Sequence, residues 1–353
     1  MVARVWIQRS LFDAVPPDWL AGLEPVPFAG TVLPAASDGR AVGLALRSTA
    51  QVTGADLARL PALRVVATAS SGTDHLDEAA LTRAGVALIT GRGGNAAAVA
   101  DWVEWALGRS FAAPLAAPLS GRRVVVVGVG AVGACVADRL LARGAEVALV
   151  DPPRAARDRA FVGVSLAQAL GQPCAALTLH VPLTRGGDHA TAGLIGAVQI
   201  AQLAGAVVLN AARGGVLDEA AALPARRSDQ LAGLYVDTFV GEPAAAPDMV
   251  RGCDAATPHI AGHSREGRLR VVWLAMDGLR RHLGLAGLPP LADCVHELRR
   301  DTPADSASWH PFSALDGSAR RFVAAVAGRD FSAVRAAHYR LELAACRGPQ
   351  ASQ

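Results

Sequence analysis

Lysine is absent from this 353-residue sequence, and all 34 of its basic residues are arginines. A P-loop needs a lysine to hold phosphates, and Schiff-base catalysis needs a lysine amine, so both chemistries are excluded. The net charge is only +3, and the arginines are scattered instead of forming basic runs interleaved with aromatic residues. The sequence therefore does not predict a nucleic-acid partner.

Cysteine and long apolar runs are also scarce. The five cysteines are far apart and odd in number, and their spacing fits neither a disulfide framework nor a zinc site, so we expect reduced thiols and no metal. Residues 1–10 lack the unbroken apolar stretch of a signal peptide, and the other apolar runs are too short to span a membrane. We expect a cytoplasmic protein that has no membrane partner.

Short apolar runs that alternate with helix-like stretches are abundant. Residues 5–7, 42–46, 63–68 and 86–89 form such runs in the first part of the chain, and the alternation predicts a small parallel α/β domain there. Further runs from residue 123 onward predict a second, doubly wound parallel sheet. With 353 residues, of which 52% are hydrophobic, the chain is long enough to bury the cores of more than one domain.

A glycine-rich turn follows the apolar run 123–127 and precedes a helix-like stretch. Gly128 would allow a tight turn out of the strand, Gly130 would let a pyrophosphate approach the backbone, and Gly133 would let the helix pack closely on the sheet. The N–H groups of the first helical turn would then face the phosphates. A plain β-α-β turn is the alternative, but strand, glycines, helix, second strand and the acid Asp151 at its end together favour a dinucleotide site.

Three residues with matching chemistry follow later apolar runs: Arg213, Glu242 and His259. The ends of those strands would open onto the cofactor crevice of a doubly wound sheet. An arginine can hold a carboxylate through two parallel hydrogen bonds. A histidine can move a hydroxyl proton near neutral pH, and a neighbouring glutamate would orient its ring. Each could instead be an ordinary loop or core residue, but together, downstream of the fingerprint, they predict catalysis with a nicotinamide cofactor.

The order of these motifs resembles that of the D-isomer-specific 2-hydroxyacid dehydrogenases. After the fingerprint come Asn-Ala-Ala-Arg-Gly-Gly at 210–215, the segment 237–243, and Thr-Pro-His-Ile-Ala-Gly at 257–262. Segments 71–77 and 150–154 are similar to the erythronate-4-phosphate dehydrogenase branch of that family. The resemblance covers residues 42–283 well and the two ends only loosely.

The resemblance implies an α/β protein of three parts. A Rossmann-type doubly wound parallel sheet over residues 93–265 would bind NAD. A second, flavodoxin-like α/β domain, formed by residues 1–92 and 266–284, would bind the substrate, and a small C-terminal α+β module over 285–353 would join two copies into a homodimer. The reaction implied is the oxidation of 4-phospho-D-erythronate to 2-oxo-3-hydroxy-4-phosphobutanoate, a step in pyridoxal 5′-phosphate synthesis.

The same resemblance implies roles for single residues. Arg213 would bind the substrate carboxylate and carbonyl, His259 would be the acid/base, and Glu242 would be its partner. Asp151 would bind the adenosine ribose hydroxyls, where its charge favours NAD over NADP. The other cofactor positions would be Gly128, Gly130, Ala131, Val132, Gly133, Val181, Ala211, Ala212, Asp237 and Gly262, with Asp237 holding the nicotinamide carboxamide. The substrate positions would be Ser48, Ser70 and His263, with Arg47 able to receive an anionic group.

Three departures from the family pattern bear on the substrate. His263 stands where a tyrosine is usual, residues 331–343 lack the usual Arg-Arg-Glu, and Gln8 follows the first apolar run where an acidic residue is usual. These changes leave open another phosphorylated or phosphonate D-2-hydroxy acid as the substrate. A nicotinamide-sensing binding protein is a further alternative, because one branch of the superfamily serves as transcriptional corepressors and a fold alone does not fix function.

Overall fold

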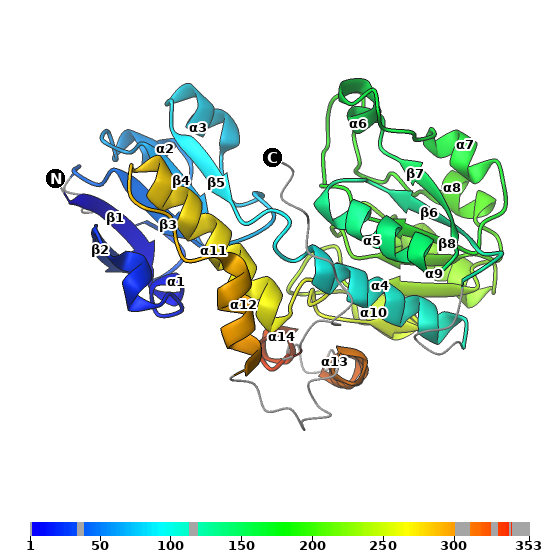
Figure 1. Ribbon diagram of the computed structural model, residues 1–353. Coiled ribbons are helices and arrows are strands. Elements are labelled where there is room, and N and C mark those ends of the chain that lie inside the picture. Colours follow the sequence, from blue (N-terminus) through cyan, green and yellow to red (C-terminus); the bar gives the residue numbers. More distant parts are fainter. Residues whose placement is uncertain are drawn as a thin grey trace. The chain divides into compact units, whose positions relative to one another are not determined.

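The computed structural model describes residues 2–33, 39–112, 119–300, 311–325, 331–338 and 340. The chain divides into two compact units, of which unit 1 comprises residues 1–95 and 266–304 and unit 2 comprises residues 96–265 and 305–353. Each unit is built round one sheet, and neighbouring strands of both sheets pair in parallel (Figure 1). The predicted α/β class is therefore confirmed.

The sheet of unit 1 has the strand order β2-β1-β3-β4-β5. Its strands are β1 (Ala3–Gln8), β2 (Leu23–Phe28), β3 (Gly43–Leu46), β4 (Val65–Thr68) and β5 (Ala87–Thr90). The helices of this unit are α1 (Arg9–Phe12), the short 3-10 helix η1 (Pro17–Leu20), α2 (Gly54–Ala58), α3 (Glu78–Arg83), α11 (Arg265–His282) and α12 (Leu291–Arg300).

Both faces of this sheet are covered, because successive side chains of a strand point to opposite sides. Val5 and Ile7 of β1 share a core with Met276 of α11. Trp6 points the other way and shares a core with Leu57 of α2. A parallel sheet that is buried on both faces in this way reads in the sequence as short, nearly continuous apolar runs, which is the pattern found there.

β2 is a strand that the sequence pattern did not reveal. It pairs in parallel with β1 over its whole length, from Leu23 opposite Ala3 to Phe28 opposite Gln8. Pro25 and Pro27 obscure it, because proline has no N–H to donate to a sheet ladder. The two prolines are two residues apart, so the missing N–H groups lie on the same side of the strand. An edge strand tolerates this loss on the side that faces away from its neighbour.

The sheet of unit 2 has the order β11-β10-β9-β8-β6-β7. Its strands are β6 (Arg123–Val127), β7 (Glu146–Val150), β8 (Ala176–Leu179), β9 (Val207–Asn210), β10 (Gly233–Val236) and β11 (Ala255–Ala256). Its helices are α4 (Ala96–Ser110), α5 (Ala131–Ala142), α6 (Pro152–Arg157), α7 (Leu166–Leu170), α8 (Ala197–Gln202), α9 (Glu219–Arg227), α10 (Pro247–Gly252), α13 (Pro311–Ala325) and α14 (Phe331–Ala336).

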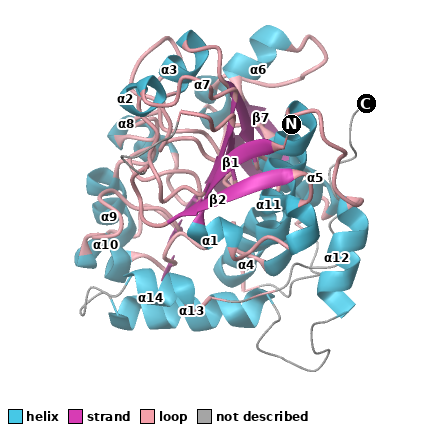
Figure 2. Ribbon diagram, turned by 90° about the vertical axis from the view of Figure 1, so that its left-hand side faces the viewer, coloured by secondary structure: helices cyan, strands magenta, loops and turns pink. Residues whose placement is uncertain are grey.

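Helices enclose the strands, as Figure 2 shows with strands in magenta. In unit 2, Val126 of β6 packs with Trp102 of α4 and Leu140 of α5, whereas Val125 faces the opposite core with Ile200 of α8. The strand order reverses beside β6, with β7 on one side and β8 on the other. Doubly wound sheets bind their ligands outside the carboxyl ends of the strands at such a reversal, and the glycine turn that begins at Gly128 lies there.

The residues after 285 are shared between the two units, with α12 in unit 1 and α13 and α14 in unit 2. Phe322 of α13 and Phe331 of α14 join the main core of unit 2, and the Trp105 indole donates to Asp316 at 2.9 Å. Residue 339 and residues 341–353, which include part of the departing segment 331–343, lie outside the described residues. The dimerisation role predicted for residues 285–353 stays a prediction. No helix of the described chain combines the length and apolarity needed to cross a membrane.

Candidate active site

The turn after β6 has the shape that a dinucleotide requires. Gly128 has a φ of 86°, and a Cβ there would lie 2.7 Å from the His180 carbonyl oxygen. A Cβ at Gly133 would lie 1.9 Å from the Gly128 carbonyl oxygen, so α5 can approach the turn only with a glycine at that position. A Cβ at Gly130 would meet nothing within 4 Å, which leaves room beside the backbone. The three glycines therefore fit the roles expected at a pyrophosphate site.

The N-terminus of α5 adds a favourable field for an anion. Gly130 is its N-cap residue and supplies no side-chain hydrogen bond. The N–H groups at the start of a helix, here those of Ala131 and Val132, have no acceptor inside the helix. The helix dipole also gives this end a partial positive charge. Because the helix has 12 residues, its first turn can offer several aligned donors to a phosphate.

Asp151 lies beside the same turn. Its Oδ2 accepts from the Val129 N–H at 2.7 Å, and its Oδ1 accepts from the Arg154 N–H at 2.9 Å as the N-cap of α6. Arg154 Nη1 in turn donates to the Val129 carbonyl oxygen at 2.8 Å. The carboxylate is thus fixed beside the predicted phosphate site, and each oxygen retains acceptor capacity for a ribose hydroxyl.

The loop that carries Arg213 is held by a buried amide. Asn210, which is 0% exposed, accepts from the Ala212 N–H at 3.1 Å and donates to the Arg213 carbonyl oxygen at 3.1 Å. Gly214 permits the loop to pack on the next one, because a Cβ there would lie 2.0 Å from the Phe239 carbonyl oxygen. The loops after β9 and β10 are therefore in direct contact.

His259 and Glu242 form a hydrogen-bonded pair. His259 Nδ1 lies 2.7 Å from Glu242 Oε2, and the other carboxylate oxygen of Glu242 accepts from the Phe239 N–H at 2.7 Å. Because a carboxylate only accepts, the Nδ1 of His259 carries the proton and Nε2 is left as a base when the ring is neutral. The side chain of His259 is 33% exposed. The sequence-predicted acid/base and its partner are thus in contact.

The backbone of His259 is held in an unusual conformation by Asp237. His259 has a φ of 53°, in the left-handed region that non-glycine residues seldom adopt. Its N–H donates to the Asp237 carbonyl oxygen at 2.7 Å, and the Asp237 carboxylate accepts from the N–H groups of Ile260 at 2.8 Å and Ala261 at 2.9 Å. Asp237 therefore fixes the loop 257–261 as well as standing at a predicted cofactor position.

A buried relay continues from Asp237 to α4. The Thr257 hydroxyl donates to Asp237 at 2.5 Å, and the Trp102 indole N–H donates to that hydroxyl at 2.9 Å. Burial raises the pKa of the Asp237 carboxyl, although the charge of His259 and the donated hydrogen bonds act to lower it. The relay thus couples the loop 257–261 to the core of unit 2.

Carboxylates cluster near Glu242. The Val240 N–H donates to Glu219 at 2.7 Å. Burial raises the pKa of Glu219, and the negative charges of Glu242 and Asp218 add to that rise.

The remaining predicted cofactor positions of unit 2 lie on loops that follow its strands. Val181 comes directly after His180, whose carbonyl oxygen meets the Gly128 turn, and a Cβ at Gly128 would also lie 2.7 Å from Val181 Cγ1. Ala211 lies within the loop held by Asn210. Gly262 follows the loop that Asp237 fixes, and its exposure is intermediate. Their contact with a cofactor stays a prediction.

His263 has a basic neighbour from the C-terminal part of the chain. Its N–H donates to the Ile260 carbonyl oxygen at 2.8 Å, which continues the turn after His259. Its Nε2 lies 3.3 Å from Arg335 Nη2 of α14. Because a guanidinium can only donate, Nε2 accepts in this contact. Residue 335 lies in the segment that lacks the family's usual arginines, yet it brings an arginine to the predicted substrate position.

Unit 1 carries the predicted substrate positions Ser48 and Ser70. The Ser70 hydroxyl donates to the Gly72 carbonyl oxygen at 2.7 Å, and Ser48 lies exposed after β3. Gln8, which is 4% exposed, accepts from the Arg47 N–H at 2.8 Å and donates to the Thr49 hydroxyl at 3.0 Å. An amide can do both, whereas the acid usual at this position could only accept.

The Arg47 side chain lies in an environment that disfavours its charge. Burial, together with the positive charge of Arg268, lowers the pKa of the Arg47 guanidinium. An anion bound there would relieve this cost, which accords with the expectation that Arg47 receives an anionic group.

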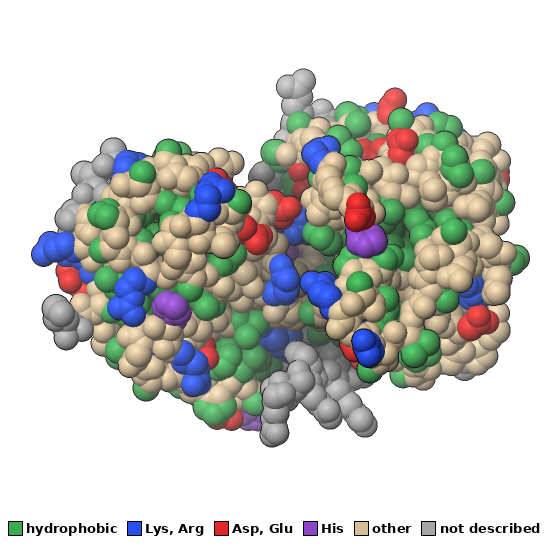
Figure 3. Space-filling model, turned by 90° about the horizontal axis from the view of Figure 1, so that it is seen from above, with side chains coloured by type: hydrophobic (Ala, Val, Ile, Leu, Met, Phe, Trp, Pro, Cys, Tyr) green, Lys and Arg blue, Asp and Glu red, His purple; other side chains and the backbone are tan. Residues whose placement is uncertain are grey.

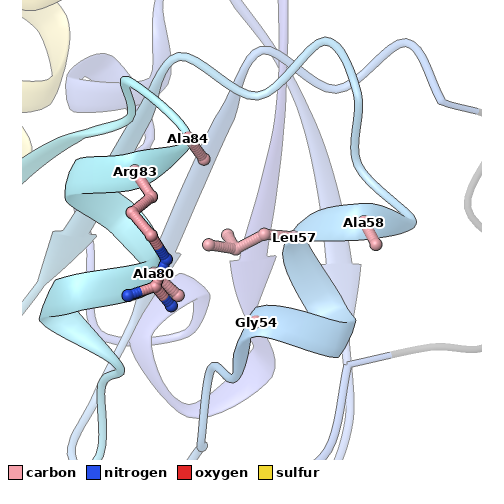
Figure 4. Close-up of a pocket in the computed structure, with 6 residues that line it drawn as sticks. All are labelled: Gly54, Leu57, Ala58, Ala80, Arg83 and Ala84. Carbon is pink, nitrogen blue, oxygen red and sulfur yellow. The ribbon is translucent and has the colours of Figure 1, made fainter.

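A surface groove of about 330 Å³ lies between α2 and α3 (Figure 4). Its walls are formed by Gly54, Leu57, Ala58, Ala80, Arg83 and Ala84. Arg83 is its single charged side chain, and none of the sequence-predicted site residues lines it. The groove therefore offers no chemistry to the reaction. On the face seen in Figure 3, basic side chains stand among acidic and apolar ones.

The sequence motifs contain Asn210 and Thr257 but indicate no role for either residue. Both are fully buried polar residues, and a polar residue at the end of an apolar run is a signal for such a buried hydrogen bond. Trp102 gave no signal, because a tryptophan at helical spacing reads as core. Its hydrogen bond to Thr257 spans 155 positions of sequence.

Comparisons with known proteins identify the family of the chain. The family described as "D-isomer specific 2-hydroxyacid dehydrogenase, NAD binding domain" matches residues 92–261. The erythronate-4-phosphate dehydrogenase of Aeromonas hydrophila is 36% identical over 290 residues, which cover 80% of this chain and 76% of that protein. That of Salinibacter ruber is 39% identical over 246 residues, covering 68% and 62%.

Among solved structures, the TT0316 protein from Thermus thermophilus has a TM-score of 0.63 and 27% identity, over 81% of this chain and 99% of that one. The matched region contains the glycine turn, Asp151, Arg213, Glu242 and His259, and the fit of the turn to a pyrophosphate supports the cofactor of the matched domain. The chain therefore belongs to the D-isomer specific 2-hydroxyacid dehydrogenases and is an NAD-dependent oxidoreductase.

Proposed function

We propose that this protein oxidises the C2 hydroxyl of 4-phospho-D-erythronate to give 2-oxo-3-hydroxy-4-phosphobutanoate, in vitamin B6 synthesis. The observation that carries the proposal is the His259–Glu242 pair, with Nδ1 and Oε2 2.7 Å apart, in a chain whose relatives at 36% and 39% identity are erythronate-4-phosphate dehydrogenases. NAD supplies the hydride acceptor when bound. The protein must therefore position the hydroxy acid and remove its hydroxyl proton.

His259 is the base in this proposal. With its Nδ1–H directed to Glu242, the neutral ring presents Nε2, which takes the C2 hydroxyl proton. The hydrogen on C2 leaves as a hydride, with the electron pair of the C2–H bond, for the acceptor that NAD supplies when bound. The ring then becomes a cation, and the Glu242 carboxylate stabilises that charge. Arg213 holds the substrate carboxylate through paired hydrogen bonds, so that C2 is fixed relative to His259.

The cofactor contacts are part of the proposal. The backbone at Gly128, Gly130 and Gly133 and the first turn of α5 would hold the pyrophosphate, and Asp151 would hold the adenosine ribose. The remaining positions would border the ribose and nicotinamide: Ala131, Val132, Val181, Ala211, Ala212, Asp237 and Gly262. The open space at Gly130 and the fixed carboxylate of Asp151 support these roles.

Basic side chains near two of the proposed substrate residues, His263 and Ser48, support a phosphate group on the substrate. His263 and Arg335 lie 3.3 Å apart in unit 2, and a proton added to His263 would let both donate to an anion. Arg47 in unit 1 lies near Ser48 in the loop held by Gln8. We propose Ser48 and His263 as substrate-binding residues on this basis, and Ser70 on the resemblance to the family.

The test follows nicotinamide reduction and product formation with purified protein, NAD and a 2-oxo acid that reoxidises the cofactor. 4-Phospho-D-erythronate is compared with D-erythronate, 3-phosphoglycerate and phosphonolactate. We expect turnover of the phosphorylated erythronate alone and its loss in His259→Ala. Turnover of only another acid would refute the substrate, and full turnover in His259→Ala would refute the base.

The phosphate contact has its own test. His263→Ala should raise KM for the phosphorylated substrate, while His189→Ala, at an exposed histidine of the same unit, should leave KM unchanged. An unchanged KM in His263→Ala would overturn the contact.

We further propose a cytoplasmic homodimer joined through residues 285–353. The support is the resemblance to the family, whose C-terminal segment is expected to pair two subunits. Sedimentation of the purified protein at micromolar concentration should give the mass of a dimer, and a monomer would contradict the proposal.

A further inference from the structure

Arg340 is an arginine whose side chain is completely buried in unit 2. Both it and its partner Asp101 of α4 have side chains that are 0% exposed, and Nη1 lies 3.1 Å from Asp101 Oδ2. Its Nη2 donates to the Ala98 carbonyl oxygen at 2.7 Å and to the Ala261 carbonyl oxygen. Arginine is almost never fully buried unless it is paired, so the burial of Arg340 depends on these contacts.

The contact with the Ala261 carbonyl oxygen connects Arg340 to the loop that carries His259. Ala261 lies two residues after His259, and its N–H already donates to Asp237 Oδ2 at 2.9 Å. Arg340 binds the carbonyl oxygen of the same residue. The Arg265 N–H also donates to the Arg340 carbonyl oxygen at 3.0 Å. Arg340 is therefore hydrogen-bonded to both ends of the segment 261–265.

We infer that Arg340 is a positioning residue for His259. The left-handed backbone of His259 is a conformation that the surroundings must impose. Asp237 imposes it from the N–H side of the loop, and Arg340 imposes it from the carbonyl side. Without Arg340 the loop keeps one of its two anchors, and the His259 ring loses its fixed direction toward the substrate hydroxyl.

The network supplies a matched control. Arg139 Nη1 also binds Asp101, at 2.7 Å, and binds Glu104 at 2.8 Å, but its contacts lie with α4 and not with the catalytic loop. Arg139→Met and Arg340→Met thus each remove one cation from the same buried carboxylate, and only Arg340→Met also releases the loop.

The experiment compares wild type, Arg340→Met, Arg340→Lys and Arg139→Met by thermal unfolding, NAD binding and steady-state kinetics, well below the lowest unfolding temperature. We expect kcat to fall about 10- to 100-fold in Arg340→Met, as for a small displacement of a catalytic group, with NAD affinity unchanged. Arg340→Lys, which keeps the charge but reaches fewer carbonyls, should lose less. Arg139→Met should lower the unfolding temperature and keep kcat within about 2-fold.

A spectroscopic measurement keeps the test independent of the substrate. The proton on His259 Nδ1, hydrogen-bonded to Glu242, should give a downfield proton NMR signal that His259→Gln removes. The signal should persist in Arg139→Met and shift or broaden in Arg340→Met or, if that variant does not fold, in Arg340→Lys. An unchanged signal with unchanged kcat in the Arg340 variants would overturn the inference, as would equal losses of kcat in Arg139→Met and Arg340→Met. If only the proposed substrate proves wrong, the NMR signal, which needs no substrate, still tests the role of Arg340.

Discussion

Replacing Glu242 by glutamine should disable His259 even though the shape of the side chain is preserved. In the native protein both carboxylate oxygens accept, one from the His259 ring at 2.7 Å and one from the Phe239 N–H at 2.7 Å. A glutamine has one oxygen and one NH₂ group, so it can accept at only one of these places. One of the two native hydrogen bonds must be lost in either orientation of the amide.

Each orientation has a distinct consequence. If the amide oxygen faces His259, the NH₂ group opposes the Phe239 N–H, and two donors meet. If the oxygen faces Phe239, the NH₂ group donates to His259 Nδ1, and the ring must carry its proton on Nε2, where it cannot accept the hydroxyl proton. Only the first orientation leaves Nε2 as a base, and its unsatisfied donors cost about 1–3 kcal/mol. The productive orientation is then disfavoured, which lowers the rate roughly 5- to 150-fold, before the lost stabilisation of the cationic ring is added.

The assay is steady-state oxidation of the hydroxy acid by NAD, with NAD affinity measured separately. We expect kcat in Glu242→Gln to fall by about 100-fold or more and NAD affinity to remain that of wild type. Glu219→Gln is the matched control, because Glu219 also accepts a backbone N–H at 2.7 Å, from Val240, yet the structure gives it no contact with the His259 ring. A kcat in Glu242→Gln equal to that of Glu219→Gln would refute the reasoning.

Three further predictions follow from single contacts. Asp151→Ser should raise the ratio of kcat/KM with NADP to that with NAD, because a charge that repels a 2′-phosphate is removed; an unchanged ratio would count against Asp151 as the ribose contact. Gly133→Ala should abolish NAD binding and lower Tm, since its Cβ would lie 1.9 Å from the Gly128 carbonyl oxygen; calorimetry and a binding titration measure both. Burial lowers the pKa of His180 from 6.5 to about 3, so as the pH falls below 6.5 the unfolded chain binds a proton that the folded chain does not, and stability is lost. Between pH 7 and pH 5, wild type should therefore lose about 2 kcal/mol more unfolding free energy than His180→Gln. Denaturant titrations that show equal losses would contradict the shift.

The sequence predicted what is local in the chain. The fingerprint at 128–133 combines residues that are neighbours in sequence, and each glycine is required by atoms close to it, as the contact between Gly133 and the Gly128 carbonyl shows. The parallel α/β class also followed from the sequence, because strands buried on both faces leave short apolar runs. β2 was missed because Pro25 and Pro27 remove the pattern, although an edge strand can accept both.

The site was predictable only as a set of residue types. Arg213, Glu242 and His259 could be selected by their chemistry and their place after strands, but their mutual geometry depends on groups far away in sequence. The contact of Gly214 with Phe239 brings two of the loops together, and this needs the order of β9 and β10 in the sheet. No periodicity in the sequence reports such a contact.

The support of the catalytic loop shows most clearly why sequence patterns have this limit. Asp237 lies in a motif that indicates cofactor binding, yet its carboxylate accepts from the backbone N–H groups of Ile260 and Ala261 and from the Thr257 hydroxyl, and so holds residues 257–261. Arg340 lies in a segment with no recognisable motif, yet it binds the same loop from a distance of 79 residues in sequence. Both act on backbone N–H and carbonyl groups, which every residue except proline possesses in full, so neither the loop's residue types nor their spacing can reveal the partner. The identity of His259 as the base follows from chemistry, whereas the precision of its placement is set by these two buried charges.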